Sequence, residues 1–338
     1  MDVFISVILL IVGFVMLVKG ADWFVDGAAG IAAKAKISEL VIGLTVVAFG
    51  TSAPELAVSI SSAIHGSADL TIGNVVGSNI LNILLILGLS AVFTPLPVNK
   101  NLRKIDFPFL IAVSALFILF GALNNRIDRA EGVVMAVSLV AYTAFLIWYS
   151  LRERKREETN GMPEMKAEEA ESETNNKVKA WYRKMTQKVW FLVVITLIGL
   201  ALVVWGADIS VNAATAIARE LGVSERIIGL TVVAIGTSLP ELVTSVTAAI
   251  KGKTDIAVGN IVGSNIFNIL MVAGISAAII PLPFDKAFVI DSCVALGAAV
   301  LLAALGYLPS HKIKRWGGVI MLLCAAGYFV YLFMLPTA

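Results

Sequence analysis

The chain has 338 residues, of which 58% are hydrophobic and only 15% are charged, and its formal net charge is +2. A soluble globular domain carries about a quarter charged residues, so this composition excludes an ordinary soluble protein. The small net charge gives no indication of a nucleic-acid partner. The two cysteines, Cys293 and Cys324, lie in apolar runs and indicate no disulfide framework.

Apolar runs long enough to cross a bilayer as helices recur along the whole chain. They predict an all-α integral membrane protein with ten transmembrane helices. In chain order the expected spans are 3–26, 38–64, 70–93, 107–123, 131–150, 189–212, 224–250, 256–280, 287–306 and 316–334.

A charged segment at 151–188 separates residues 1–150 from residues 189–338. It has few apolar residues and cannot bury a core of its own, so we expect a solvated linker. A regulatory role of this linker is the alternative.

Lys and Arg in short loops favour the cytoplasmic side of a membrane. With the N-terminus outside, most loop cations fall on the side of the linker, among them Lys34, Lys36, Lys100, Arg103, Lys104, Lys251, Lys253, Lys312, Lys314 and Arg315. We therefore expect a multi-pass plasma-membrane protein with both termini outside and a cytoplasmic linker.

The sequence contains an internal repeat with an offset of 186 positions, in which residues 38–88 match residues 224–274. Gly-Thr-Ser-Ala-Pro-Glu at 50–55 returns as Gly-Thr-Ser-Leu-Pro-Glu at 236–241. Each copy holds five expected spans, and an odd number inverts the second copy in the membrane. Inverted five-helix repeats are typical of secondary transporters whose site lies near the midplane.

Glu55 and Glu241 each fall inside an expected span, where an isolated carboxylate costs several kcal/mol. Each follows a proline, Pro54 or Pro240, which removes a backbone donor and breaks the helix. Freed carbonyl oxygens should then converge with the carboxylates and with the hydroxyls of Thr51, Ser52, Thr237 and Ser238. Such an all-oxygen environment suits a hard cation such as Ca²⁺ or Na⁺.

The next span of each half adds a hydroxyl and an amide four positions apart on one helical face. These are Ser78 with Asn82, and Ser264 with Asn268. The other asparagines, Asn74, Asn79, Asn260 and Asn265, are expected to tie broken backbone together. A buried glutamate can also be a structural hydrogen-bond acceptor, but its duplication beside hydroxyls and a proline break favours an ion site.

Some other repeated residues are given plainer roles. Gly73 and Gly77, like Gly259 and Gly263, have the spacing typical of close helix packing. Asp22 and its equivalent Asp208 are expected to have an interfacial or packing role rather than to contact an ion.

The paired motifs around Glu55 and Glu241, with Gly77-Ser78-Asn79 and Gly263-Ser264-Asn265, resemble the two α-repeats of the sodium/calcium exchanger family. That family belongs to the cation/calcium antiporter superfamily. The resemblance covers nearly the whole chain, and the short linker is similar to that of prokaryotic members.

The resemblance implies a monomeric antiporter in the lipid bilayer, without enzyme activity or cofactor, that exchanges Na⁺ for Ca²⁺ by alternating access. It also implies exchange of about three sodium ions for one calcium ion, so that net charge crosses the membrane. Some members carry an acidic residue where this chain has Asn268, and the neutral amide favours exchange that is independent of K⁺.

By the same resemblance, Ca²⁺ would be held by Glu55, Glu241 and the carbonyls of Thr51 and Thr237. One sodium site would use Ala48, Thr51, Ser52, Glu55 and Ser78. The equivalent sodium site would use Ala234, Thr237, Ser238, Glu241 and Ser264. Asn82 and Asn268 would line the centre.

Three alternatives remain open at the level of the sequence. A Ca²⁺/H⁺ antiporter or a K⁺-dependent Na⁺/Ca²⁺ exchanger could use the same glutamates. A cation channel would conduct without a counter-ion. An intramembrane hydrolase is disfavoured, because the sequence offers no nucleophile–base pair and no metal-binding histidine cluster.

Overall fold

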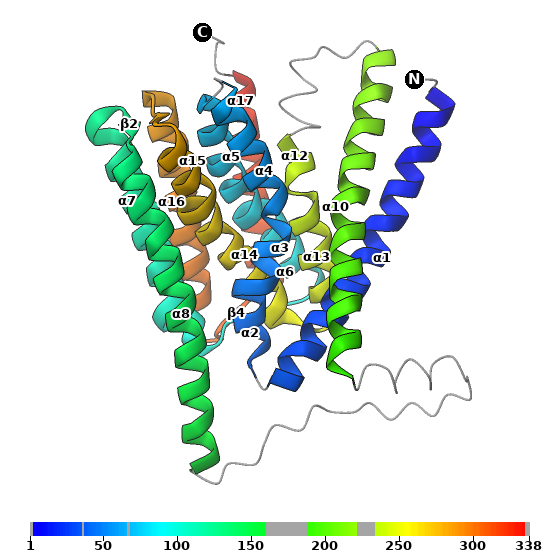
Figure 1. Cartoon of the computed structure of the whole chain (residues 1–338), viewed down its shortest axis with the longest axis vertical. Coiled ribbons are helices and arrows are strands. Elements are labelled where there is room, and N and C mark those ends of the chain that lie inside the picture. The colour runs from blue at the N-terminus through cyan, green and yellow to red at the C-terminus, as the bar shows by residue number, and fades with distance from the viewer. Residues whose placement is uncertain (1–2, 36, 66–67, 160–187, 222–233, 335–338) are drawn as a thin grey trace.

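A computed structural model describes residues 3–35, 37–65, 68–159, 188–221 and 234–334 (Figure 1). The first half contains α1 (Val3–Ala35), α2 (Glu39–Ile42), the π-helical turn η1 (Gly43–Val47), α3 (Ala48–Thr51), α4 (Ala53–Ile64), α5 (Ala68–Ile80), η2 (Leu81–Leu87), α6 (Gly88–Phe93), β1 (Leu96–Pro97), η3 (Leu102–Asp106), α7 (Phe107–Asn124), β2 (Arg126–Ile127) and α8 (Arg129–Thr159).

In the described residues the second half repeats the order of helices and strands of the first half, except that no π-helical turn corresponds to η3. The residues equivalent to α2 and η1 lie outside the description. The elements of the second half are α10 (Val189–Glu220), α12 (Ala234–Thr237), α13 (Leu239–Ile250), α14 (Thr254–Phe267), η5 (Asn268–Ala273), α15 (Gly274–Ile279), β3 (Leu282–Pro283), α16 (Lys286–Tyr307), β4 (Lys312–Ile313) and α17 (Arg315–Met334).

Eight helical segments of the described residues are long and apolar enough to cross a membrane. A ninth is the pair Glu39–Thr51 and Ala53–Ile64, bent by 44°. The expected span 224–250 is described only from Ala234 onward, as α12 and α13, and its beginning lies outside the described residues. Most of the linker, 160–187, also lies outside them.

Three helices run beyond the ends that hydropathy predicts. α1 and α10 continue to Ala35 and Glu220 instead of ending near 26 and 212. The added residues are rich in alanine, the strongest helix former, which a hydropathy boundary does not register. α8 likewise continues to Thr159, so residues 151–159 of the expected linker are helical.

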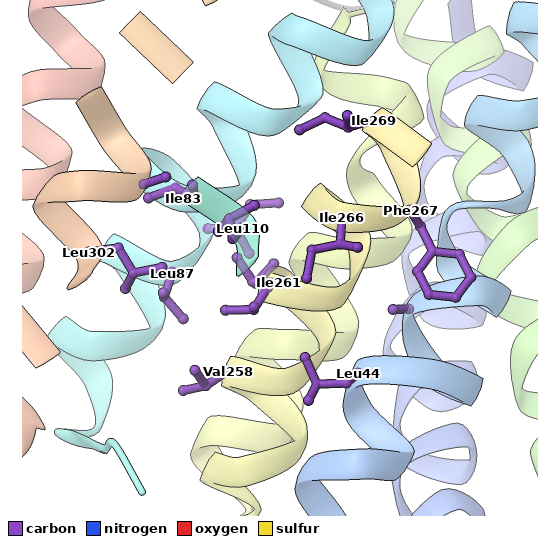
Figure 2. Packing of buried hydrophobic residues seen from close by; sticks show 14 of the residues in the cluster. Leu44, Ile83, Leu87, Leu110, Val258, Ile261, Ile266, Phe267, Ile269 and Leu302 are labelled. Atoms are coloured by element: carbon purple, nitrogen blue, oxygen red, sulfur yellow. The ribbon is translucent and has the colours of Figure 1, made fainter. Parts of the chain in front are cut away.

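α14 occupies the centre of the bundle, and the other long helices surround it. Of the most apolar stretch of the span Thr254–Ile279, which runs through α14, η5 and α15, 89% is buried. The span Leu70–Phe93, through α5, η2 and α6, follows with 78%, whereas the span of α1 is only 28% buried. Figure 2 shows Val258, Ile261 and Ile266 of α14 packed among side chains of neighbouring elements. The two helices that follow the glutamate-bearing segments therefore form the core of the protein.

α1 and α10 lie side by side at one edge of the molecule (Figure 1). A Cβ atom added at Gly20 would lie 2.8 Å from the carbonyl oxygen of Gly199, and one at Gly13 would lie 2.9 Å from that of Gly206. Glycines allow membrane helices to approach closely. Gly13 is equivalent to Gly199 and Gly20 to Gly206, so the two contacts exchange under the offset of 186.

The short strands show the same exchange. β1 pairs with β4 through Leu96 and Ile313, and β2 pairs with β3 through Ile127 and Leu282. The residues before β2 and β4, Asn125 and His311, both have left-handed backbone, with φ of 51° and 47°. Each of their carbonyls accepts a bond from the equivalent position of the other half, with N–O distances of 2.8 Å from the amides of Phe284 and Val98.

Gly13 and Gly20 of α1 and Gly199 and Gly206 of α10 form the close contact between the two helices, here called the glycine seam. This contact leads to a stability prediction. We expect Gly20→Ala to destabilise the protein by about 1–3 kcal/mol, because the new methyl group meets the backbone of α10. The measurement is the thermal unfolding midpoint in detergent. Gly297→Ala on α16 is the matched control, since its Cβ would meet nothing within 4 Å. Equal stability of the two variants would contradict a tightly packed seam.

Candidate functional site

The site forms where two helices are interrupted at equivalent places. Ser52 separates α3 from α4, and Ser238 separates α12 from α13. Pro54 and Pro240 stand in the first turn of the following helices, where a missing N–H is tolerated. The interruption is a bend rather than an unwound segment, because the Ser52 amide still donates to the Ala48 carbonyl with an N–O distance of 3.0 Å. The predicted break is confirmed, but the Ala48 carbonyl keeps its helical partner.

The two glutamates are fully enclosed, with exposed fractions of 1% for Glu55 and 0% for Glu241. The Ser52 hydroxyl donates to Glu241 Oε1 across an oxygen–oxygen distance of 3.2 Å. Because Ser52 belongs to the first motif and Glu241 to the second, this bond brings the two halves of the repeat together.

Three of the four carboxylate oxygens have no hydrogen-bond partner among the described residues. They are both oxygens of Glu55 and Oε2 of Glu241. Burying an ionised carboxylate without a partner is strongly unfavourable, so such groups are normally paired or bound to a metal ion. The unmet acceptors make this pair of glutamates the candidate cation site.

Hydroxyl groups from both halves surround the carboxylates. The Thr51 hydroxyl donates to Asn260 Oδ1 at 3.1 Å and lies 3.5 Å from the hydroxyl of Ser264. The Ser238 hydroxyl donates to that of Ser78 at 3.3 Å. These contacts join the helix breaks of each half to the core helix of the other half.

Asn82 and Asn268 lie at equivalent positions where α-helical geometry gives way to the π-helical turns η2 and η5. Single π-helical turns are rare and frequent at functional sites. Both side chains are 0% exposed. Asn268 donates to Asn79 Oδ1 at 3.1 Å, whereas both amide atoms of Asn82 and the Oδ1 atom of Asn268 have no partner in the described part of the chain.

Two serines that sequence reasoning missed support the asparagines. Asn74 donates to the Ser59 hydroxyl at 2.9 Å, and Asn260 donates to the Ser245 hydroxyl at the same distance. Ser59 and Ser245 stand four positions after the glutamates and match under the repeat offset, a signal that could have identified them. Asn74 also donates to the Glu55 carbonyl at 3.3 Å, as expected of a residue that ties backbone together.

Ten of the twelve predicted site residues are buried, Thr237 is half-buried, and contacts between the two halves of the chain join several of them. Thr51, Ser52, Ser78, Ser264 and Asn268 contact residues of the other half or of a neighbouring helix. Ala48 is buried at the start of α3, Ala234 begins α12, and Thr237 ends it. The described polar groups of these residues offer oxygen atoms and amides but no thiol or imidazole, which favours Ca²⁺ or Na⁺ over a transition metal.

Comparisons with known proteins match nearly the whole chain. Residues 5–148 and 191–335 match the family model described as sodium/calcium exchanger protein. The putative antiporter CaxA of Alkalimonas amylolytica is 38% identical over 332 residues, covering 97% of this chain and 99% of that protein. The sodium/calcium exchanger MaX1 of Methanosarcina acetivorans is 33% identical over 353 residues, covering 97% and 99%.

Solved structures of a sodium-calcium exchanger, NCX_Mj, share the fold. In the crystal soaked with zero Na⁺ and Ca²⁺, that chain superposes on this one with a TM-score of 0.81 and 31% sequence identity, over 98% of this chain and 99% of that one.

Proposed function

Because the chain belongs to the sodium/calcium exchanger family, we propose that it is a secondary antiporter that exchanges Na⁺ for Ca²⁺ by alternating access. The observation that carries the proposal is the pair of buried glutamates, with three carboxylate oxygens unpartnered among the described residues. Carboxylates that stay ionised inside a membrane protein are stabilised by bound cations.

In this proposal Ca²⁺ is bound by the carboxylates of Glu55 and Glu241 and by the backbone carbonyls of Thr51 and Thr237. One Na⁺ site is built from Ala48, Thr51, Ser52, Glu55 and Ser78, and the other from Ala234, Thr237, Ser238, Glu241 and Ser264. Asn82 and Asn268 face the centre between them. The burial of Glu55, Glu241 and Ser52 and the contacts between the two halves support this assignment.

The charge balance explains why the two ions exclude each other. Two carboxylates neutralise one Ca²⁺ or two Na⁺. Since the proposed sites share both glutamates, joint occupancy would place cations at contact distance in a poorly screened interior, where they repel strongly. Binding of one ion species then displaces the other, and exchange follows if only the loaded site reorients.

We also propose that residues 1–150 and 189–338 are two inverted five-helix repeats with motifs at 38–88 and 224–274, giving ten transmembrane helices in all. The exchanged contacts support this arrangement, since a two-fold axis makes residue i of one half meet residue j of the other and the reverse. In this arrangement the linker 151–188 is cytoplasmic and both termini are outside. Both glutamates come from one chain, so a monomer in the plasma membrane suffices.

The first prediction concerns the glutamates. Glu55→Gln and Glu241→Gln keep the size of the side chain and remove one charge. We expect Na⁺-driven Ca²⁺ uptake into proteoliposomes to fall about 100-fold or more, because removing one member of a buried charged set costs roughly 3–5 kcal/mol. Glu39→Gln, outside the site, is the control and should transport normally. Near-normal exchange by Glu241→Gln would refute a site built on two carboxylates.

The second prediction concerns potassium and voltage. Asn82 and Asn268 are neutral, so the centre carries only the charges of Glu55 and Glu241. We expect Ca²⁺ uptake driven by Na⁺ to persist when choline replaces K⁺ and protons are clamped. We also propose the stoichiometry that the family resemblance implies, about three Na⁺ for one Ca²⁺, so that one net positive charge crosses per cycle. The free energy that drives uptake should then change with membrane potential by about 2.3 kcal/mol per charge per 100 mV, and the rate should respond to voltage.

Each rival gives a different result in that assay. A K⁺-dependent exchanger loses uptake in choline, a Ca²⁺/H⁺ antiporter needs a proton gradient instead of Na⁺, and a channel needs no counter-ion. Voltage-independent uptake would contradict the proposed stoichiometry.

The third prediction concerns orientation. Lys34 and Glu220 are equivalent under the repeat offset and end α1 and α10. Single cysteines at these positions, in a chain with Cys293→Ser and Cys324→Ser, should react with impermeant thiol reagents from opposite sides of the membrane. Labelling of both from one side would exclude inverted repeats.

A further inference from the structure

Lys251, in the turn between α13 and α14, is ion-paired with α1. Its Nζ atom lies 3.1 Å from Asp22 Oδ1 and 2.8 Å from Asp26 Oδ1, and it also donates to the Asp22 carbonyl at 3.0 Å. Lys253, two positions later, instead pairs with Glu39 Oε1 of α2 at 2.7 Å. These two lysines, separated by one residue, thus pair with different elements, Lys251 with α1 and Lys253 with α2.

The α1–α10 pair has a small core of its own. Leu17 and Ala21 of α1 pack on Val203 and Ala207 of α10, and this cluster is separate from the main core. Farther along α1, Phe24, Val25, Ala28, Ala29 and Ala32 belong to the main core. Even so, α1 and α10 contact each other far more extensively, through the small core and the glycine seam, than either helix contacts any other element. The pair is therefore suited to move as one body against the rest of the bundle.

The α1–α10 pair packs unequally on the two halves of the protein, with its most extensive contact on α13 of the second half. α1 packs along α13, where Leu239 and Val243 meet the small core. The equivalent contact would lie between α10 and α4, but α10 packs on α12, α13 and α3. The two-fold relation, which holds inside the α1–α10 pair and inside the rest of the bundle, is thus broken between them.

The ion pair of Lys251 shares this broken symmetry. Under the offset of 186, Lys251 corresponds to His65, and Asp22 and Asp26 correspond to Asp208 and Asn212. His65 is exposed and lies with Nδ1 2.7 Å from the Ser61 carbonyl of its own helix. Asp208 is exposed and has no ion pair with any described residue.

We propose that Lys251, Asp22 and Asp26 form a latch that holds the α1–α10 pair in one access state, and that His65 and Asp208 form the corresponding contact in the opposite state. The inference rests on the proposed alternating-access function. The physical reason lies in the inverted repeats. When the α1–α10 pair moves against the rest of the bundle, each contact that it loses with one half is replaced by the equivalent contact with the other half.

The two latches differ in strength. Lys251 faces two carboxylates, whereas the opposite set offers one carboxylate and one amide. The paired side chains are 27%, 34% and 46% exposed, so solvent weakens the attraction. The latch should therefore bias the equilibrium between access states about two- to tenfold rather than lock it.

The first test removes the charge. At the membrane face that carries Lys251, the latch joins α1 to the turn between α13 and α14 and so favours the state closed at that face. Lys251→Gln should therefore let more of the protein open there and lower the apparent KM for Ca²⁺ at that face about two- to tenfold. Lys251→Arg should restore the original value. Lys253→Gln is the matched control, since its partner Glu39 lies outside the α1–α10 pair, and it should leave the KM unchanged. Equal effects of the two glutamine variants would overturn the latch.

The second test fixes the contact. Asp26→Cys with Lys251→Cys, in a chain with Cys293→Ser and Cys324→Ser, is joined by a short reducible bifunctional thiol reagent. Cross-linking should stop exchange and reductant should restore it. The same treatment of Glu39→Cys with Lys253→Cys should leave exchange intact. Undiminished exchange by the cross-linked 26–251 protein would show that this contact does not open during the cycle.

The parent chain without native cysteines separates the two levels of inference. If that chain shows no Na⁺-driven Ca²⁺ uptake, the proposed function fails. If it transports Ca²⁺ and the 26–251 cross-link is harmless, only the latch fails.

Discussion

Two carboxylates enclosed in a membrane protein, with three unpartnered oxygens in the described structure, are the constraint on which the rest depends. Ionised and empty, such a site carries a large desolvation penalty, which a bound cation relieves. The same penalty opposes reorientation of the empty, doubly charged site, and this favours coupled exchange over one-way leak. The helix breaks place hydroxyl and amide groups beside the two carboxylates, where their oxygen atoms can help to bind such a cation.

The features that could be predicted from the sequence are local or repeated. Hydropathy located the eight apolar spans and the bent ninth of the described residues, the offset of 186 found Glu55 and Glu241, and the prolines predicted the helix breaks. Contacts between distant segments were beyond reach, because spacing shows which residues share a helix face but not which helix that face meets. Asp22 is an example: a packing or interfacial role was expected, and the structure pairs it with Lys251 of a distant turn.

The missed features around the site have the same cause. Ser59 and Ser245 carried a repeat signal, yet their role appears only when α4 is set beside α5 and α13 beside α14. The glycine seam of α1 and α10 depends on two helices far apart in sequence. The π-helical turns at Asn82 and Asn268 are departures from regular helix geometry that hydropathy does not register.

Near-equivalence of the two halves makes their differences informative. Ser52 donates to Glu241, while its equivalent Ser238 donates to Ser78, and Glu55 has no hydrogen-bond partner for either oxygen in the described structure. The α1–α10 pair is displaced toward α13 in the same sense, on the side of the repeat that carries Glu241. If the halves are inverted repeats, as proposed, a symmetric architecture held in an asymmetric state has an alternative in which the halves trade places. The hydrogen bonding of the glutamates and the packing of the α1–α10 pair thus depart from the repeat symmetry together, as the proposed alternating access expects.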